Sequence, residues 1–222
     1  MKSHLIKLAA SALVFLVLFI DPAQAKKKIL IVGVKANMGL SKSTETIFDN
    51  KLSFHYAYGG LVNYNLMPFL GIETGLQKSR SGFAEDLTIT NELGDYVTTA
   101  KISYQYNYLI VPAYLRLRFL GLYATGGVNI AFNTDNVATS NSTALPRDFL
   151  NELEYVNDVK RTNVDLHLGL GYQIMFFKRI GFFLEAGYNR QLDSLIDIPE
   201  LSEVRLYNIT VGGGLVVSLI NK

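Results

Sequence analysis

Apolar and polar residues alternate with a period of two in eight separate runs of this sequence, and that pattern is the strongest constraint on its fold. A period of two is typical of a β-strand whose two faces meet different surroundings. The runs are 30–40, 54–67, 70–77, 96–119, 122–133, 164–174, 182–189 and 207–219. The sequence therefore predicts an all-β chain with eight main strands.

The run 96–119 is ambiguous. Leu109, Val111, Ala113, Leu115, Leu117 and Phe119 form its apolar face. Tyr104, Tyr106 and Tyr108 have the same parity as Arg116 and Arg118 on its polar face. This mixture suggests a β-bulge between the tyrosines and the arginines. Pro112 fits such an irregularity because proline cannot donate a hydrogen bond to a neighbouring strand.

Alternation alone does not say whether the apolar face lines a core or meets lipid. A soluble eight-stranded barrel of the lipocalin type would bury its apolar face. Here the polar face is poor in Lys and Glu and carries Gly, Asn, Gln, Thr and His with a few scattered charges. That composition suits a narrow, packed polar interior, and so favours an apolar face turned towards lipid.

The connections between the runs also favour a membrane barrel. Short connections at 67–69, 120–121 and 177–181 alternate with longer polar ones at 42–53, 79–99, 134–161 and 192–204. Outer-membrane barrels show this asymmetry of short periplasmic turns and long external loops. Aromatic residues that suit an interfacial girdle lie near the strand ends: Tyr56, Tyr58, Phe119, Phe132, Tyr172, Phe176 and Phe182. We therefore predict an eight-stranded, antiparallel, up-and-down transmembrane β-barrel.

The first 25 residues have the pattern of a cleaved signal peptide. Lys2 and Lys7 precede an apolar stretch at 8–20, and Ala23-Gln24-Ala25 follows. The alternative is a membrane anchor, but a spanning helix needs roughly 20 apolar residues. We expect export, cleavage after Ala25 and a single outer-membrane barrel domain at 26–222.

Composition excludes several classes of function. The 21 Lys and Arg residues nearly balance the 19 Asp and Glu residues, so we expect no nucleic-acid partner. The chain has no cysteine, which removes disulfides and thiolate chemistry. It also shows no phosphate-binding loop or dinucleotide fingerprint, and we expect no cofactor.

Six charged residues have the parity of the polar face and are predicted to form a charge network in the lumen. These residues are Lys35, Glu73, Arg116, Arg118, Asp165 and Glu185. Four of them (Glu73, Arg116, Arg118 and Glu185) lie close to short connections and can meet at one level. Buried charges require partners, so we expect a salt-bridged plug. The alternative is a gated path lined by the same groups.

The sequence gives little support to catalysis. The exported chain has two histidines, His55 and His167, which the strand order places on opposite sides of the barrel. Asp165 lies two residues from His167 and hydroxyls such as Thr125 are available, but no strand serine is expected beside a histidine. We predict no catalytic, cofactor-binding or metal-binding residues.

Two of the long connections have patterns of their own. Residues 87–90 and 96–102 continue their strands beyond the membrane around 91–95. In 134–161, Pro146 opens a short helical pattern with Phe149, Leu153 and Val156 on one face. The acidic residues of this segment are compatible with binding a cation or a partner, and also with a helix face that is simply exposed to solvent.

Three motifs resemble the small outer-membrane barrel proteins of Bacteroidota, labelled porin-family or PorT-like, with an eight-stranded barrel of the OmpA and OmpX type. Residues 33–41 (GVKANMGLS) are similar to the opening strand of that family. Residues 108–112 (YLIVP) resemble its central strand, and 184–188 (LEAGY) its penultimate one. The resemblance implies placement in the bacterial outer membrane and does not imply an open pore.

These observations predict a non-enzymatic barrel with a closed lumen and a structural or surface-interaction role. Its expected partners are outer-membrane lipid and an extracellular or envelope protein bound through 79–99 and 134–161. A small diffusion pore or a transport or secretion component is the alternative. A lipid-modifying enzyme of the outer membrane is the third hypothesis.

Overall fold

The structure is a closed antiparallel β-barrel. It was obtained as a computed structural model and describes residues 29–44, 50–90, 96–140, 159–176, 179–195 and 204–220. Its long strands are β1 (Ile29–Ser43), β3 (Ser53–Asn65), β4 (Leu70–Thr90), β5 (Tyr96–Phe119), β6 (Leu122–Ser140), β7 (Thr162–Phe176), β8 (Ile180–Gln191) and β9 (Leu206–Ile220). A two-residue strand, β2 (Asn50–Lys51), pairs with β4.

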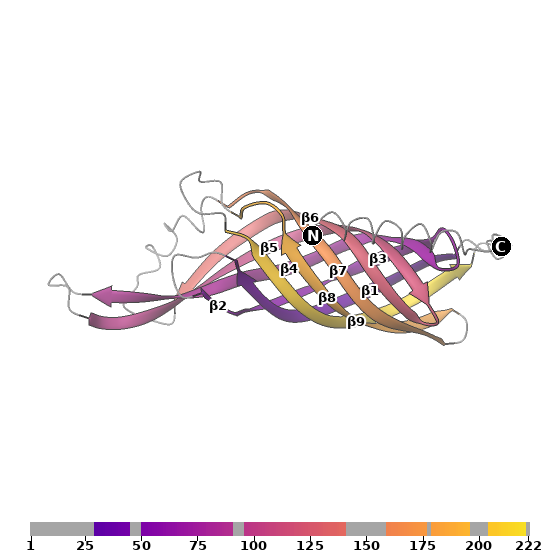
Figure 1. Cartoon of the computed structure of the whole chain (residues 1–222), viewed down its shortest axis with the longest axis horizontal. Helices are drawn as coiled ribbons and strands as arrows, with labels where there is room; N and C mark the ends of the chain where they lie inside the picture. The colour runs from indigo at the N-terminus through magenta and orange to yellow at the C-terminus, as the bar shows by residue number, and fades with distance from the viewer. Residues whose placement is uncertain are drawn as a thin grey trace, which may run out of the picture.

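Each long strand pairs with the next one along the chain, and β1 pairs with β9 from Ile29 opposite Ile220 to Ser43 opposite Leu206. This last pairing closes the sheet, and the tilted strands wrap around a common axis (Figure 1). The predicted eight-stranded antiparallel barrel is confirmed. In the described part of the chain, no helix is long and apolar enough to cross a membrane.

The period-two alternation separates the inside of the barrel from the outside. On β7, Leu170 exposes 70% of its surface, whereas its neighbours Gly169 and Gly171 face inward. On β8, Leu184 is 63% exposed and the next residue, Glu185, is 6% exposed. Apolar side chains thus cover the outside and most polar strand residues face the lumen, which is the arrangement of a barrel in lipid.

The bulge expected between the tyrosines and the arginines of β5 is absent from this described strand. The pairing of β5 with β4 keeps one register from Leu117 to Thr98, so Tyr104, Tyr106 and Tyr108 face inward with Arg116. The register shift lies beside Tyr108 in the pairing with β6, where Asn107 opposes Asp135 and Tyr108 opposes Asn133. The extra residue therefore belongs to β6.

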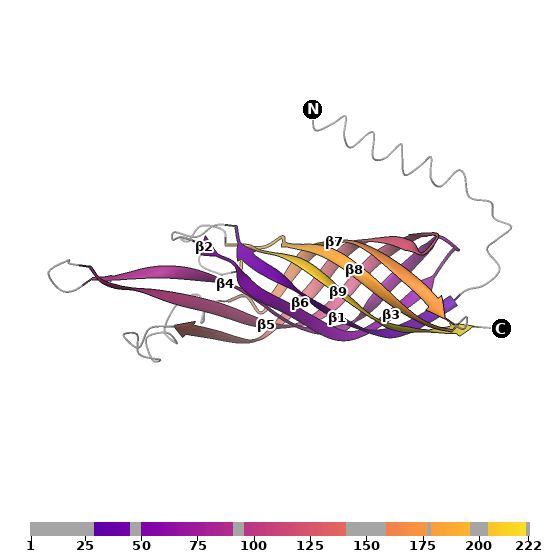
Figure 2. The same cartoon turned by 90° about the horizontal axis from the view of Figure 1, so that it is seen from below.

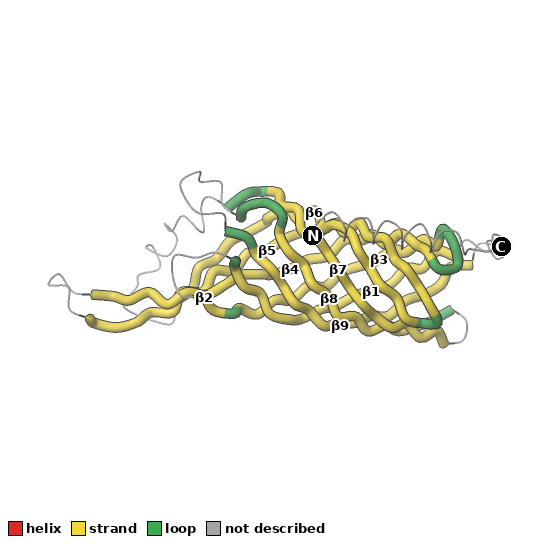
Figure 3. Tube along the Cα trace, in the orientation of Figure 1, coloured by secondary structure: helices red, strands yellow, loops and turns green. Residues whose placement is uncertain are grey.

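The two ends of the barrel differ in the length of their connections (Figure 3). At one end, called the inner end here, short connections such as 66–69 and 120–121 join the strands. Leu120 and Gly121 have φ values of 49° and 89°, as a two-residue turn between twisted antiparallel strands requires. The opposite end, called the outer end, carries the long connections. The helix predicted from Pro146 lies outside the described residues.

Strands β4 and β5 continue together beyond the outer end of the barrel (Figures 1 and 2). They pair up to Thr90 opposite Tyr96. A membrane crossing needs only about 9–11 residues of a tilted strand, whereas β4 has 21 and β5 has 24. The prediction that 87–90 and 96–102 extend these strands is confirmed.

Glu85 lies in this extension and is buried, with 4% of its surface exposed. No described residue donates a hydrogen bond to its Oε1 atom. Burial disfavours the charged carboxylate and raises the pKa of Glu85 to about 7. The folded hairpin therefore retains a proton at pH values where the unfolded chain has lost it.

This difference makes the hairpin less stable as the pH rises from about 4.5 to about 7. We expect backbone amides of 81–86 to exchange hydrogen faster at pH 8 than at pH 5, after correction for intrinsic rates. The variant Glu85→Gln has no proton to lose and should show equal protection at both pH values. Equal protection in the unmodified protein would contradict the prediction.

Candidate functional site

Four charged side chains meet inside the barrel near its inner end. Lys35 Nζ of β1 lies 2.5 Å from Glu185 Oε1 of β8 and 3.9 Å from Glu73 Oε1 of β4. Arg116 Nη1 of β5 donates to Glu73 Oε2 at 2.7 Å. All four residues are at least 94% buried. Two cations and two anions thus compensate one another in a space shielded from water.

Tyr123 of β6 completes these contacts into a ring. Its hydroxyl donates to Glu185 Oε2 at 3.1 Å, and the Arg116 guanidinium carbon lies 3.6 Å from its ring centroid. Gln173 Oε1 accepts a further hydrogen bond from Arg116 Nη2 at 2.8 Å. We call Lys35, Glu73, Arg116, Tyr123 and Glu185 the charge ring.

Glycines on the neighbouring strands make room for the charge ring. Lys35 is paired with Gly59 and Gly214, and Glu185 with Gly171 and Gly212. A Cβ atom at position 171 would lie 2.3 Å from Tyr123 Cζ. The glycines of the polar face therefore oppose long charged side chains, because a narrow lumen cannot hold two long side chains at one level.

Two of the six predicted charges lie outside the ring. Arg118 Nη2 donates to Asn63 Oδ1 at 3.2 Å, and Arg118 flanks Arg116 towards the inner end. Asp165 is only partly buried and lies near the outer end of β7, and within the described residues it forms no ion pair. The structure thus brings Lys35, Glu73, Arg116 and Glu185 together and leaves Asp165 apart.

Apolar layers lie on both sides of the charge ring. Below it, towards the inner end, Ile31, Leu61, Phe183 and Val216 pack with Tyr123. Near the outer end, a larger cluster is built around Phe83, Tyr104 and Tyr106 and includes Leu195 and Val204, which flank the connection after β8. Sequence parity placed these tyrosines on the polar face, but their packing into an apolar cap was not predicted.

Between the charge ring and the outer cluster lies a polar cavity of about 40 Å³. Lys35, His55, Tyr108, Asp165 and His167 are among its lining residues. A cavity of this size holds a few water molecules, since one needs about 10–15 Å³ of such space. This cavity is therefore too small to hold a solute larger than a few water molecules.

Each histidine of the cavity pairs with a hydroxyl. His167 Nε2 lies 3.1 Å from Thr125 Oγ1, and its Nδ1 lies 2.7 Å from Asn189 Oδ1. His167 also stacks on Tyr114, with ring centroids 4.1 Å apart. Contrary to the prediction that no strand serine lies beside a histidine, His55 Nδ1 lies 2.8 Å from Ser81 Oγ. Extending the alternation of 70–77 along β4 places Ser81 on the inward face, and this parity could have predicted the pair.

These pairs have the partners of an acid–base site, and their side chains are buried. Both histidines are 3% exposed and lie between the charge ring and the outer cluster. The described residues contain no group of three or more His, Cys, Asp or Glu side chains that could hold a metal ion. A nucleophile also requires a path for its substrate, and Thr125 and Ser81 are both buried among the described residues.

An apolar exterior, a closed sheet and a paired polar interior define a small membrane-spanning β-barrel. The chain belongs to the outer membrane protein beta-barrel domain family, whose sequence profile matches residues 10–215. Among curated proteins, none matches the chain.

Solved structures of similar fold include three bacterial outer-membrane proteins. OprG from Pseudomonas aeruginosa is 14% identical, with 87% of this chain and 96% of that chain covered and a TM-score of 0.44. Neisserial surface protein A is 12% identical, with 85% and 97% covered and a TM-score of 0.39. The outer membrane protease OmpT from Escherichia coli is 11% identical, with 88% and 97% covered and a TM-score of 0.33.

The charge ring predicts a large effect of removing one of its carboxylates. Glu73→Gln leaves Arg116 without a carboxylate partner in the buried lumen and should lower the free energy of unfolding by about 3 kcal/mol. The measurement is the urea midpoint of the folded barrel, followed by heat-modifiable gel mobility. The matched variant Asp165→Asn alters a carboxylate outside the ring and should lower the midpoint much less. Equal midpoints for Glu73→Gln and the unmodified protein would contradict a stabilising role of the ring.

Proposed function

We propose that this chain is a closed outer-membrane barrel with a structural or surface-interaction role, and that its long outer connections contact the partner. The proposal includes cleavage of residues 1–25 and membership of the porin-like or PorT-like small barrels of Bacteroidota. The main support is the layered lumen, in which the charge ring lies between two apolar layers.

The lumen supports a closed barrel because conduction needs a hydrated path. An ion moving along this barrel would have to cross the inner apolar layer and separate Lys35 from Glu185. It would also have to pass the cluster around Phe83 and Tyr106, both of which are almost fully buried. Desolvating an ion without compensation costs several kcal/mol or more.

The extended β4–β5 hairpin supports a surface role. It carries these two strands well beyond the length that crosses a membrane. Lys51 of β2 forms an ion pair with Asp86, which ties the base of the hairpin to the preceding outer connection. A long, braced hairpin at the outer end is suited to contact another molecule. The connections 79–99 and 134–161 are therefore the proposed contact regions.

The closed lumen predicts that the barrel does not conduct ions across a lipid bilayer. The barrel, purified in its folded form as judged by heat-modifiable gel mobility, should produce no steady channels when inserted into a planar lipid bilayer. Steady channels would contradict the proposal and support the diffusion pore. A change in their ion selectivity in Glu73→Gln or Arg116→Gln would then assign selectivity to the charge ring.

The surface role predicts contact at the outer hairpin. A photo-crosslinking amino acid placed at Thr88 or Thr99, both exposed, should form a discrete protein adduct in intact cells. The matched position is the lipid-facing Leu170, which is 70% exposed and should give no protein adduct. No adduct at Thr88 and Thr99, in a barrel that reaches the membrane and folds, would contradict partner binding through the hairpin.

A further inference from the structure

The outside of the barrel carries basic residues just beyond its apolar band. On β4, the outward-facing residues Ile72 and Leu76 are apolar, and Lys78 and Arg80 follow them towards the outer end. β4 begins at Leu70, and a tilted strand crosses a membrane in about 9–11 residues. Lys78 and Arg80 therefore lie at the outer boundary of the hydrocarbon layer.

Aromatic rings lie beside these two cations. Tyr58 of β3 is directly opposite Lys78, and Tyr56 is opposite Arg80. The Arg80 guanidinium carbon lies 5.7 Å from the Tyr56 ring centroid, and the rings of Tyr56 and Tyr58 stack at 6.4 Å. We call Tyr56, Tyr58, Lys78 and Arg80 the basic–aromatic patch.

The cations of the patch retain free donors. Arg80 Nε donates to Asn107 Oδ1 at 3.0 Å, which fixes the plane of the guanidinium, and its two terminal amino groups have no acceptor within the described structure. Lys78 is exposed. Neither residue forms an ion pair with a described residue. Oriented Arg and Lys donors without a carboxylate are suited to bind a phosphate group.

The charge at this level of the barrel is mainly positive. Lys42 on β1 and Arg190 on β8 also face outward at the outer end, on either side of Tyr207 of β9. Of the acids nearby, Asp86 is paired with Lys51, Asp135 lies two strands from Arg80, beyond Asn107, and the exposed Asp193 follows the end of β8. Lys42, Lys78, Arg80 and Arg190 therefore complement an anionic surface, which at this height is the headgroup layer of the outer leaflet.

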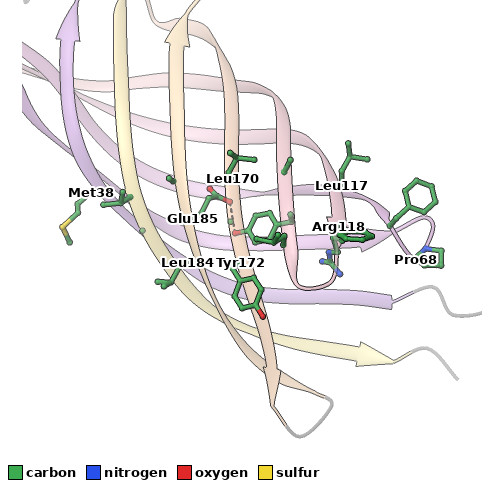
Figure 4. Close-up of a pocket in the computed structure, with 17 residues that line it drawn as sticks. Met38, Pro68, Leu117, Arg118, Leu170, Tyr172, Leu184 and Glu185 are labelled. Carbon is green, nitrogen blue, oxygen red and sulfur yellow. Dashed lines mark hydrogen bonds between the residues drawn. The ribbon is translucent and has the colours of Figure 1, made fainter. Parts of the chain in front are cut away.

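Exposed apolar side chains on the outside of the barrel begin next to the patch. Met38, which is 59% exposed, is paired with Tyr56 on one side and with Val211 on the other. The apolar surface continues over Leu184 and Leu170 towards Leu117 near the inner end (Figure 4). This surface suits acyl chains, and the patch at its outer end suits their anionic headgroup.

We propose that the basic–aromatic patch binds the phosphate groups of a phosphorylated glycolipid of the outer leaflet, whose acyl chains lie along the apolar surface below. Tyr56 and Tyr58 contact the sugar or the headgroup boundary, where aromatic rings are favoured. Arg80 and Lys78 donate to the phosphate. The proposal concerns the outer surface of the barrel and is independent of whether the lumen conducts.

The test compares lipid binding by the folded full barrel and its variants. The probes are purified bisphosphorylated lipid A, the same lipid A after removal of its phosphates, and phosphatidylglycerol. Binding is measured by native mass spectrometry from detergent. The double variant Lys78→Gln/Arg80→Gln should bind the phosphorylated lipid A at least about tenfold more weakly, because two charge-assisted contacts are lost.

The matched control is Arg179→Gln, which neutralises an exposed arginine at the inner end and should bind lipid A within about twofold of the unmodified protein. Unmodified barrel should also lose affinity for dephosphorylated lipid A, a measurement that does not depend on the folding of any variant. Equal binding of the phosphorylated and dephosphorylated lipids, or unchanged binding by the double variant, would overturn the proposal. Equal affinity for phosphatidylglycerol would show a general anionic surface and would overturn the choice of a glycolipid.

Discussion

Closure of the sheet by the pairing of β1 with β9 is the constraint on which the rest of this structure depends. In lipid, no water satisfies an unpaired backbone amide or carbonyl group, so an open sheet edge is very costly. The ladder from Ile29 opposite Ile220 to Ser43 opposite Leu206 removes that edge along the length of both strands. Closure of a sheet built from eight long strands leaves a lumen only wide enough for side chains.

The narrow lumen explains the composition of the polar face. Long side chains such as Lys35 and Glu185 are opposite glycines on both neighbouring strands. The charges that do occur must pair, because each of them is removed from water. The charge ring, the cavity above it and the apolar layers are thus consequences of filling a closed, narrow interior. The same closure turns the apolar residues towards lipid.

The strands and their two faces were predictable from the sequence because alternation depends only on the spacing of neighbouring residues. The inward parity of Lys35, Glu73, Arg116 and Glu185 was predictable for the same reason. Which of these charged side chains form ion pairs across the lumen was harder to predict. Lys35 and Glu185 are 150 residues apart in sequence, and their heights depend on the stagger accumulated over several strands. The pair of His55 and Ser81 was missed because the alternating run covered only 70–77 and its predicted continuation only 87–90, whereas β4 is one unbroken strand to Thr90.

By itself the sequence determined that the chain is a barrel of eight main strands with a polar inside, an apolar outside and one end of long connections. Each of these properties follows from local periodicity and from the residues that interrupt it. Only the tertiary structure decided which charges meet and that Tyr104 and Tyr106 cap the lumen. It also decided that Lys78 and Arg80 stand beside Tyr58 and Tyr56 at the membrane boundary. The physical reason is that strand register and tilt set the height of every side chain, and these quantities are fixed only when all the strands close into one sheet.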